Sequence, residues 1–152
     1  MEITRTFDIL DQMGSIYGYK EDTLAARING TWKKYSSKDY MDNSYAVAYG
    51  ILSLGLKKGD KIATISNNRP EWNFFDMGMA MAGVVQVPIY PTISEEEYEY
   101  ILNHAAPKLV VLSDKALFEK IKPIADKIKS VEKVYTFNEV DGAENWTVLR
   151  DL

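Results

Sequence analysis

The sequence predicts an α/β fold in which a largely parallel sheet is flanked by helices and preceded by an N-terminal helix and a β-hairpin. The first observation is the run from residue 57 to residue 92, which reads as turn, strand, helix and strand. Residues 61–66 (KIATIS) and 84–89 (VVQVPI) are short runs rich in β-branched residues, and the apolar segment 70–82 between them has helical length. The second observation is that a helix followed by a strand occurs again downstream. This alternation is typical of a parallel sheet.

The segment before this unit predicts three elements. Thr6 is placed to cap a short helix that ends near Gly18. Asn29-Gly30 separates two strand-like runs within residues 24–35, which is a strong signal for a hairpin. Ser36 and Asp39 have the spacing of a capping box, and the helix that follows should end at Gly55. The inward face of that helix is expected to hold Tyr40, Ser44, Val47, Ala48, Ile51 and Leu52.

Prolines divide the central and later segments. Pro70 suits the first turn of the helix 70–82, and Pro88 is expected to end the pairing of the strand 84–89. Ser94 and Glu97 form a second capping box for a helix that Pro107 stops.

The last third of the chain continues the alternation. Residues 108–112 form a buried strand, and Asp114 can cap a helix that carries apolar residues as far as Ile128. Pro123 should kink or split that helix. Residues 132–137 form the next strand, 138–145 a polar loop, and 146–152 the beginning of a further element.

Composition indicates one ordinary globular domain of 152 residues, with 46% hydrophobic and 26% charged residues. The formal net charge of −4 argues against a nucleic-acid partner, and without cysteine neither disulfides nor thiolate zinc sites can form. No run reaches the roughly 18 apolar residues of a membrane helix, and no secretory signal pattern is seen, so we expect a cytoplasmic protein.

Groups that could carry chemistry are few. The single histidine, His104, has no neighbours with metal-ligand spacing, and we interpret it as structural. Neither glycine-rich phosphate-loop pattern occurs, which disfavours a nucleotide site built from these residues alone. We therefore assign no catalytic residue and no metal ligand.

Ligands of parallel sheets bind at the carboxyl ends of strands, which here are the loop 66–69 and the turn 90–92. The substrate-side candidates are therefore Asn67, Asn68, Arg69, Trp72 and Thr92. The alternative for Asn67, Asn68 and Arg69 is a structural role, in which they form the loop and cap the helix. The cluster of methionine and aromatic residues from Trp72 to Met81 could line an apolar pocket, although such clusters are more often plain core.

Four segments, TWKKYSSKDY, GLKKGDKIATISNNRPEW, MAMAGVVQVPIYPT and YILNHAAPKLVVLSD, together resemble the amino-terminal part of adenylate-forming acyl-CoA synthetases. The Asn-Arg-Pro-Glu-Trp and Tyr-Pro-Thr runs look most like bacterial long-chain fatty acid–CoA ligases. Asp39 departs from the pattern, since glutamate is common at that place.

The resemblance implies a parent ligase that converts ATP and a fatty acid into an acyl-adenylate and pyrophosphate, and then transfers the acyl group to CoA with loss of AMP. It implies ATP, Mg²⁺ and CoA as cofactors of the parent. The family's phosphate loop, ribose-binding aspartate and mobile carboxyl-terminal domain match nothing in residues 1–152. We therefore expect residues 1–152 to be a single domain, the N-terminal portion of a larger AMP-binding domain, inactive alone and without a bound cofactor.

Two other interpretations stay open. The chain could be a standalone α/β module that binds a small molecule without catalysis. It could instead belong to another adenylate-forming enzyme, such as an aryl–CoA ligase or a peptide-synthetase adenylation domain. For the parent, the expected partners are a fatty acid, the remainder of its own chain and, as a peripheral contact, a membrane surface. An unpaired strand edge predicts self-association of the isolated chain.

Overall fold

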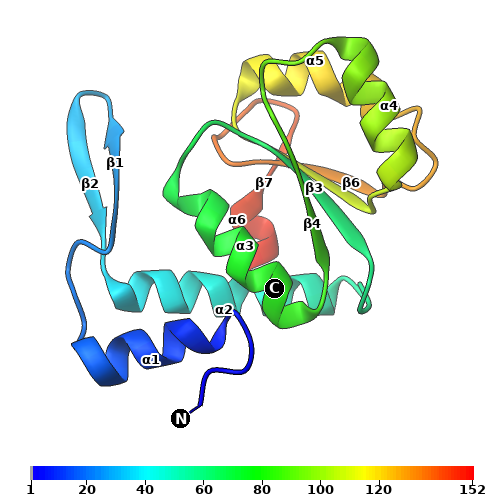
Figure 1. Ribbon diagram of the computed structural model, residues 1–152. Coiled ribbons are helices and arrows are strands. Elements are labelled where there is room, and N and C mark those ends of the chain that lie inside the picture. Colours follow the sequence, from blue (N-terminus) through cyan, green and yellow to red (C-terminus); the bar gives the residue numbers. More distant parts are fainter. Residues whose placement is uncertain (1) are drawn as a thin grey trace.

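The computed structural model describes residues 2–152. Its centre is a five-stranded parallel sheet with helices on both faces, and a two-stranded hairpin stands to one side (Figure 1). The helices are α1 (Asp8–Tyr17), α2 (Ser37–Ser53), α3 (Pro70–Ala82), α4 (Glu95–Ala105), α5 (Lys115–Ala125) and α6 (Trp146–Arg150). The strands are β1 (Leu24–Ile28), β2 (Thr31–Tyr35), β3 (Lys61–Ile65), β4 (Val85–Ile89), β5 (Leu109–Leu112), β6 (Lys133–Thr136) and β7 (Glu144–Asn145).

The sheet has the strand order β4-β3-β5-β6-β7, and every neighbouring pair is parallel. Counted along the chain, this is the 2-1-3-4-5 order of doubly wound folds. The first two strands are neighbours, and the chain then crosses to the other side of β3. In such sheets the crevice for a ligand opens where the order reverses, at the carboxyl ends of β3 and β5.

Two apolar cores cover the two faces of the sheet. Side chains alternate along each strand, so Ile62 points to one face while Ala63 and Ile65 point to the other. The first face packs against α2, α3 and α6, and the second against α4 and α5 (Figure 1). The α/β class with a parallel sheet is thereby confirmed.

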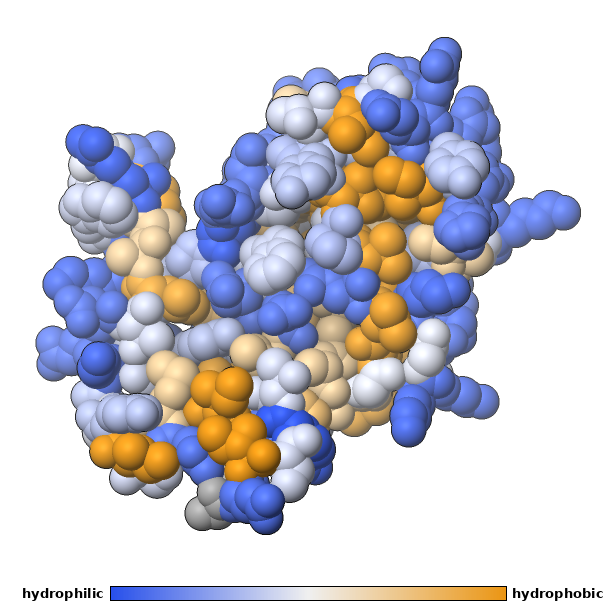
Figure 2. Space-filling view, in the orientation of Figure 1, coloured by the Kyte–Doolittle hydropathy of each residue, from blue (hydrophilic) through white to orange (hydrophobic). Residues whose placement is uncertain are grey.

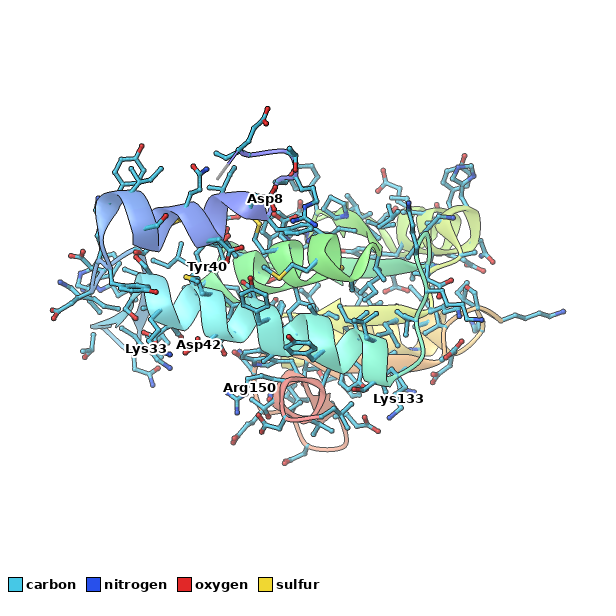
Figure 3. The ribbon with its side chains drawn as sticks, turned by 90° about the horizontal axis from the view of Figure 1, so that it is seen from below. Asp8, Lys33, Tyr40, Asp42, Lys133 and Arg150 are labelled. Atoms are coloured by element: carbon cyan, nitrogen blue, oxygen red, sulfur yellow. The ribbon has the colours of Figure 1, made fainter. Side chains whose placement is uncertain are left out.

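Glycines set the spacing between the helices of the first face. A Cβ atom on Gly78 of α3 would lie 2.7 Å from Val47 Cγ1 on α2. A Cβ atom on Gly50 of α2 would lie 1.9 Å from the backbone oxygen of Leu149 on α6. Both glycines therefore let helix backbones approach closely, and Figure 3 shows α2 running alongside α3, with α6 beneath it.

The predicted hairpin is confirmed. Asn29 and Gly30 adopt φ angles of 49° and 81°, the left-handed pair that a two-residue type I′ turn requires. The register pairs Ile28 with Thr31 next to the turn and Leu24 with Tyr35 at the base.

Both capping boxes are also confirmed, but the cap proposed for the first helix is wrong. The N-cap of α1 is Phe7, which makes no side-chain cap hydrogen bond. The first N–H groups of the helix, those of Asp8, Ile9 and Leu10, donate instead to the backbone oxygens of Arg5, Thr6 and Phe7. The carboxylate of Asp8 holds the segment before the helix, because its Oδ2 accepts from the backbone N–H groups of Thr4 (3.0 Å) and Arg5 (2.9 Å) and the Arg5 side chain pairs with it.

Three expectations based on apolar or proline signals need correction. Helix α5 continues through Pro123, which falls in its last turn, and ends at Ala125, so Ile128 is buried beyond the helix. Pairing of β4 continues past Pro88 to Ile89, because β4 is an edge strand. Leu52 is 50% exposed, since it lies at the solvent side of the inward stripe of α2.

The polar segment 138–145 holds an unexpected strand. β7 pairs with β6 through Tyr135–Glu144 and Thr136–Asn145. Its two residues have no apolar alternation, and the sequence therefore gives no strand signal. Within residues 2–152, none of the helices combines the length and apolar character needed to cross a bilayer.

Candidate functional site

The chain leaves β3 through four polar residues at the reversal of strand order. The hydroxyl of Ser66 donates to the backbone oxygen of Asn67 (2.7 Å), which tightens the exit from the strand. Asn67 and Asn68 are exposed, and Arg69 then turns inward as the N-cap residue of α3. Pro70 occupies the first helical turn, as the sequence predicts.

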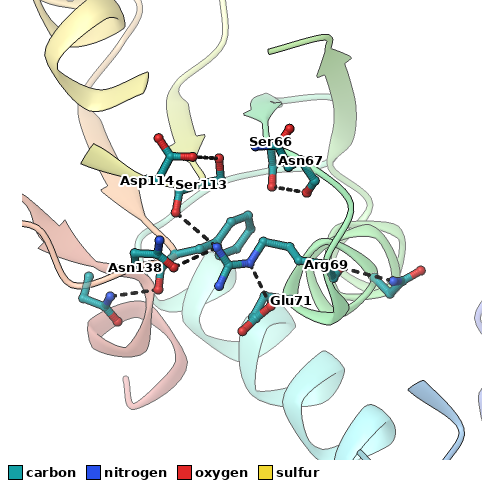
Figure 4. Close-up of polar contacts among 10 residues, drawn as sticks. Ser66, Asn67, Arg69, Glu71, Ser113, Asp114 and Asn138 are labelled. Atoms are coloured by element: carbon teal, nitrogen blue, oxygen red, sulfur yellow. Dashed lines mark hydrogen bonds and ion pairs between the residues drawn. The ribbon is translucent and has the colours of Figure 1, made fainter. Parts of the chain in front are cut away.

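Arg69 joins the ends of three strands (Figure 4). Its Nη1 donates to the backbone oxygen of Ser113 (3.1 Å), after β5, and to Oδ1 of Asn138 (3.0 Å), after β6. Its Nε donates to Oε2 of Glu71 (2.8 Å), and its guanidinium lies 5.0 Å from the ring centre of Phe137. Arg69 is therefore committed to contacts within the protein.

Glu71 completes this ion pair in a nearly buried position, with 12% of its side chain exposed against 19% for Arg69. Burial alone would raise the pKa of Glu71. The hydrogen bond and positive charge of Arg69 outweigh burial, and the pKa of Glu71 lies below its usual range. Glu71 is therefore an ionised partner of Arg69 and not a proton donor near neutral pH.

Ser113 and Asp114 stand beside this cluster and were missed by the sequence reasoning as site residues. The hydroxyl of Ser113 donates to Oδ2 of Asp114 (2.6 Å), and Oδ1 of Asp114 accepts from the backbone N–H of Leu117 (3.1 Å). The predicted cap is thus correct. The available signal was a pair of polar residues directly after the buried run LVVL, at the end of the strand beside β3.

A hollow of about 520 Å³ lies on the other side of the loop, toward the end of β4. It gathers four of the five candidates, Asn67, Asn68, Trp72 and Thr92, and leaves Arg69 outside. Its remaining lining is Ser66, Pro88, Ile89, Tyr90 and Pro91. Trp72 is half-buried and Tyr90 is 80% exposed.

This hollow is neutral and amphipathic. Amides and hydroxyls of Asn67, Asn68 and Thr92 can hydrogen-bond a ligand, while the rings of Trp72 and Tyr90 offer apolar surface. No ionisable group other than the Tyr90 phenol is among its lining residues in the described part of the chain, so it holds no general base beside a nucleophile. The geometry can position a ligand but not activate it.

The other sequence candidates have packing roles. Phe74, Phe75 and Met79 are buried in the core of the first face, as the core interpretation of the methionine and aromatic cluster expects. His104 is exposed and stacks on Tyr100, with ring centres 6.0 Å apart.

The described residues show no preformed metal cluster. Among residues 2–152, no group of three histidine, aspartate or glutamate side chains could hold a metal ion. The space beside Gly50 and Gly78 is occupied by neighbouring helices, so neither glycine leaves room for a phosphate group.

Comparisons with known proteins give a consistent result. The family model described as AMP-binding enzyme matches residues 16–151. The long-chain-fatty-acid–CoA ligase ACSBG1 of Rattus norvegicus is 28% identical over 133 residues, which are 88% of this chain and 18% of that protein. The crotonobetaine/carnitine–CoA ligase of Shigella flexneri serotype 5b is 31% identical over 103 residues, 68% of this chain and 20% of that protein.

Solved structures share the fold. A benzoate CoA ligase from Burkholderia xenovorans LB400 superposes with a TM-score of 0.77 at 16% identity, covering 98% of this chain and 28% of that chain. An anthranilate CoA ligase, AuaEII, in complex with anthranoyl-AMP gives 0.79 at 16% identity, with 97% and 28% coverage. The chain spans about a fifth of the length of the curated relatives it matches.

Proposed function

Because the chain belongs to the family of AMP-binding enzymes, we propose that it forms the amino-terminal part of an adenylate-forming acyl–CoA ligase. The observation that carries this proposal is the family match over residues 16–151, nearly the whole chain. The curated relatives named above are both CoA ligases, and each is about five times longer than the matched segment. The proposal includes a cytoplasmic location and a single domain that continues into a larger one.

For the acyl substrate we propose a long-chain fatty acid. Its support is the similarity to ACSBG1 together with the Asn-Arg-Pro-Glu-Trp and Tyr-Pro-Thr runs. The crotonobetaine/carnitine and benzoate ligases show that a similar segment serves other acids too. The test must therefore compare the activity of the parent protein with several carboxylic acids.

The role we propose for this chain is positioning. The neutral hollow of Asn67, Asn68, Trp72 and Thr92 would hold an uncharged part of the substrate side by hydrogen bonds and ring contacts. The Arg69 cluster would keep the loop 66–69 in place. We propose that ATP, Mg²⁺ and CoA are held by residues of the parent outside this chain.

ATP–pyrophosphate exchange tests the proposal. The longer protein encoded by the same reading frame should exchange labelled pyrophosphate into ATP with hexadecanoate, and much less with benzoate or crotonobetaine. The 152-residue protein should give no exchange. A parent that exchanges best with benzoate would refute the long-chain assignment, and a parent inactive with every acid would refute the ligase.

Tryptophan fluorescence addresses the alternative of a binding module. Trp72 lines the hollow, so a fatty acid that binds the 152-residue protein tightly without ATP should change its emission. A saturable change that Trp72→Phe abolishes would favour the module over the ligase.

A further inference from the structure

The methionines of residues 2–152 all lie in the first three helices. Met13 is in α1, Met41 is in α2, and Met77, Met79 and Met81 are in α3. Met79 is 1% exposed, whereas the other four are partly exposed and pack against the core of the first face. A partly exposed thioether combines apolar packing with access for an oxidant from solvent. Oxidation can therefore reach the packing between these helices at four positions.

Met13 and Met41 belong to the seam between α1 and α2, the element with which α1 makes its most extensive contact. At one end of the seam, the hydroxyl of Tyr45 donates to Oδ1 of Asp11 (2.9 Å). At the other end, Met13 and Ser37 line one small hollow of about 260 Å³. Ser37, Met41 and Tyr45 are spaced four residues apart and form one stripe along α2. Met41 therefore lies between the two places where α2 meets α1.

Helix α1 has few anchors besides this seam. Within Asp8–Tyr17, Leu10 is the only buried apolar side chain, whereas Ile9 and Ile16 are 42% and 60% exposed. Figure 2 shows the resulting apolar surface over α1, at the lower left of the view. The hydrogen bonds of the Asp8 carboxylate go to the N-terminal segment before the helix. A loss of packing at the seam can therefore release α1 without unfolding the sheet.

We propose that Met13 and Met41 make the seam between α1 and α2 sensitive to oxidation: a hydroperoxide converts both to sulfoxides, and α1 is then released from α2. With hydrogen peroxide, one oxygen forms the S–O bond, the O–O bond breaks, and the other oxygen leaves as water with both protons. Sulfur is oxidised by two electrons and the peroxide is reduced. A sulfoxide is polar, so its burial in an apolar seam is unfavourable. Methionine sulfoxide reductases restore the thioether, and α1 should then return.

Met77 and Met81 are matched positions for comparison. Both are partly exposed, as Met13 and Met41 are. Helix α3 is held much more firmly than α1, by buried aromatic side chains and by the close approach of α2 at Gly78. Oxidation of the two methionines on α3 should therefore leave α1 in place.

Peroxide titration of the 152-residue protein, followed by peptide mass spectrometry and amide hydrogen exchange, tests the proposal. At a peroxide concentration that oxidises Met13 and Met41 but leaves Met79 intact, the backbone amides of residues 12–17 should exchange roughly tenfold faster or more. The amides of β3 and β5 should exchange as before. Treatment with methionine sulfoxide reductases should restore slow exchange in α1.

Three double variants identify the sulfur atoms responsible. Met13→Leu with Met41→Leu removes both thioethers at nearly constant volume, so peroxide should leave the exchange of α1 unchanged. Met77→Leu with Met81→Leu is the matched control and should keep the response of α1. Met13→Gln with Met41→Gln places polar amides in the seam and should accelerate exchange of α1 without peroxide.

Several outcomes overturn the proposal. One is oxidation of Met13 and Met41 without faster exchange in α1, and another is a response that disappears in the control variant on α3. Acceleration that extends to β3 and β5 would show global unfolding in place of local release. Resistance of Met13 and Met41 to peroxide that already oxidises Met79 also overturns it. None of these readouts depends on ligase activity, so the inference stands or falls separately from the proposed function.

Discussion

Arg69→Met removes the guanidinium that joins the ends of β3, β5 and β6 while keeping an unbranched apolar stem. The variant leaves the carboxylate of Glu71 without its partner in a position where only 12% of the side chain is exposed. It also leaves the backbone oxygen of Ser113 without its arginine donor. We therefore expect a large loss of stability from a residue that lies in a loop.

The magnitude follows from these contacts. Removing one partner of a buried ion pair costs about 3–5 kcal/mol, and the partial exposure of both side chains favours the lower end. The bonds to Ser113 and Asn138 contribute about 1 kcal/mol each, part of which water restores at the exposed Asn138. The expected loss is about 4–5 kcal/mol, which in urea corresponds to a midpoint lower by roughly 2 M.

Urea unfolding followed by tryptophan fluorescence and circular dichroism measures this loss. Trp146 is a suitable reporter because its ring centre lies 6.3 Å from that of Phe137, the ring under Arg69. Arg27→Met is the matched control, since Arg27 is exposed on the hairpin and should change stability by about 0.5 kcal/mol or less.

The double variant Arg69→Met with Glu71→Gln separates the effect of the stranded charge from that of the lost contacts. Neutralising Glu71 should return part of the stability, leaving a loss of about 1–2 kcal/mol. A loss of less than about 1 kcal/mol for Arg69→Met, or a further loss when Glu71→Gln is added, would contradict the buried ion pair as the source of stability.

Three further predictions concern packing, pH and the hairpin. Gly50→Ala drives a Cβ atom into the backbone oxygen of Leu149 and should cost about 1–3 kcal/mol in urea unfolding; an unchanged midpoint would show that α6 does not pack on α2. Burial and the nearby charge of Asp76 raise the pKa of Tyr40 to about 12 from 10.0. The stability contributed by neutral Tyr40 is therefore complete below pH 10 and is lost as the pH rises toward 12. Tyr40→Phe should therefore reduce the fall in the free energy of unfolding between pH 10 and pH 12. An unchanged fall would contradict the raised pKa of Tyr40. Gly30→Val places a β-branched residue at φ 81° and should cost about 1–2 kcal/mol in hairpin stability. The loss should appear as faster hydrogen exchange of the backbone amides in β1 and β2. Unchanged hydrogen exchange would contradict the type I′ turn.

Local rules predicted the elements whose signals lie within a few residues. The turn at Asn29-Gly30 and the capping boxes of Ser36 and Ser94 each depend on backbone angles and hydrogen bonds over at most four residues. The cap proposed for Thr6 was wrong because the first N–H groups of α1 donate to the backbone oxygens of Arg5, Thr6 and Phe7, so no side chain is needed there.

The site was predicted less completely because it depends on strand order. The sequence placed candidates after β3 and β4, but the reversal lies between β3 and β5, which brings in Ser113 from 44 residues beyond Arg69. Nothing local indicates that Arg69 turns toward β5 while Asn67 faces the hollow near β4. The contact with substrate proposed for Asn67, Asn68, Trp72 and Thr92 stays a prediction.

The position of α6 has a consequence for the synthesis of the protein. The rings of Phe74 and Phe75 on α3 pack against Trp146, and Gly50 on α2 receives Leu149. About 70 residues separate Phe75 from Trp146, which at roughly 5–20 residues per second take the ribosome about 4–14 s to add. During that interval the nascent chain carries a complete α2–α3 pair in which Phe74 and Phe75 lack their contact with Trp146. Chaperone demand from this surface should therefore fall when α6 emerges.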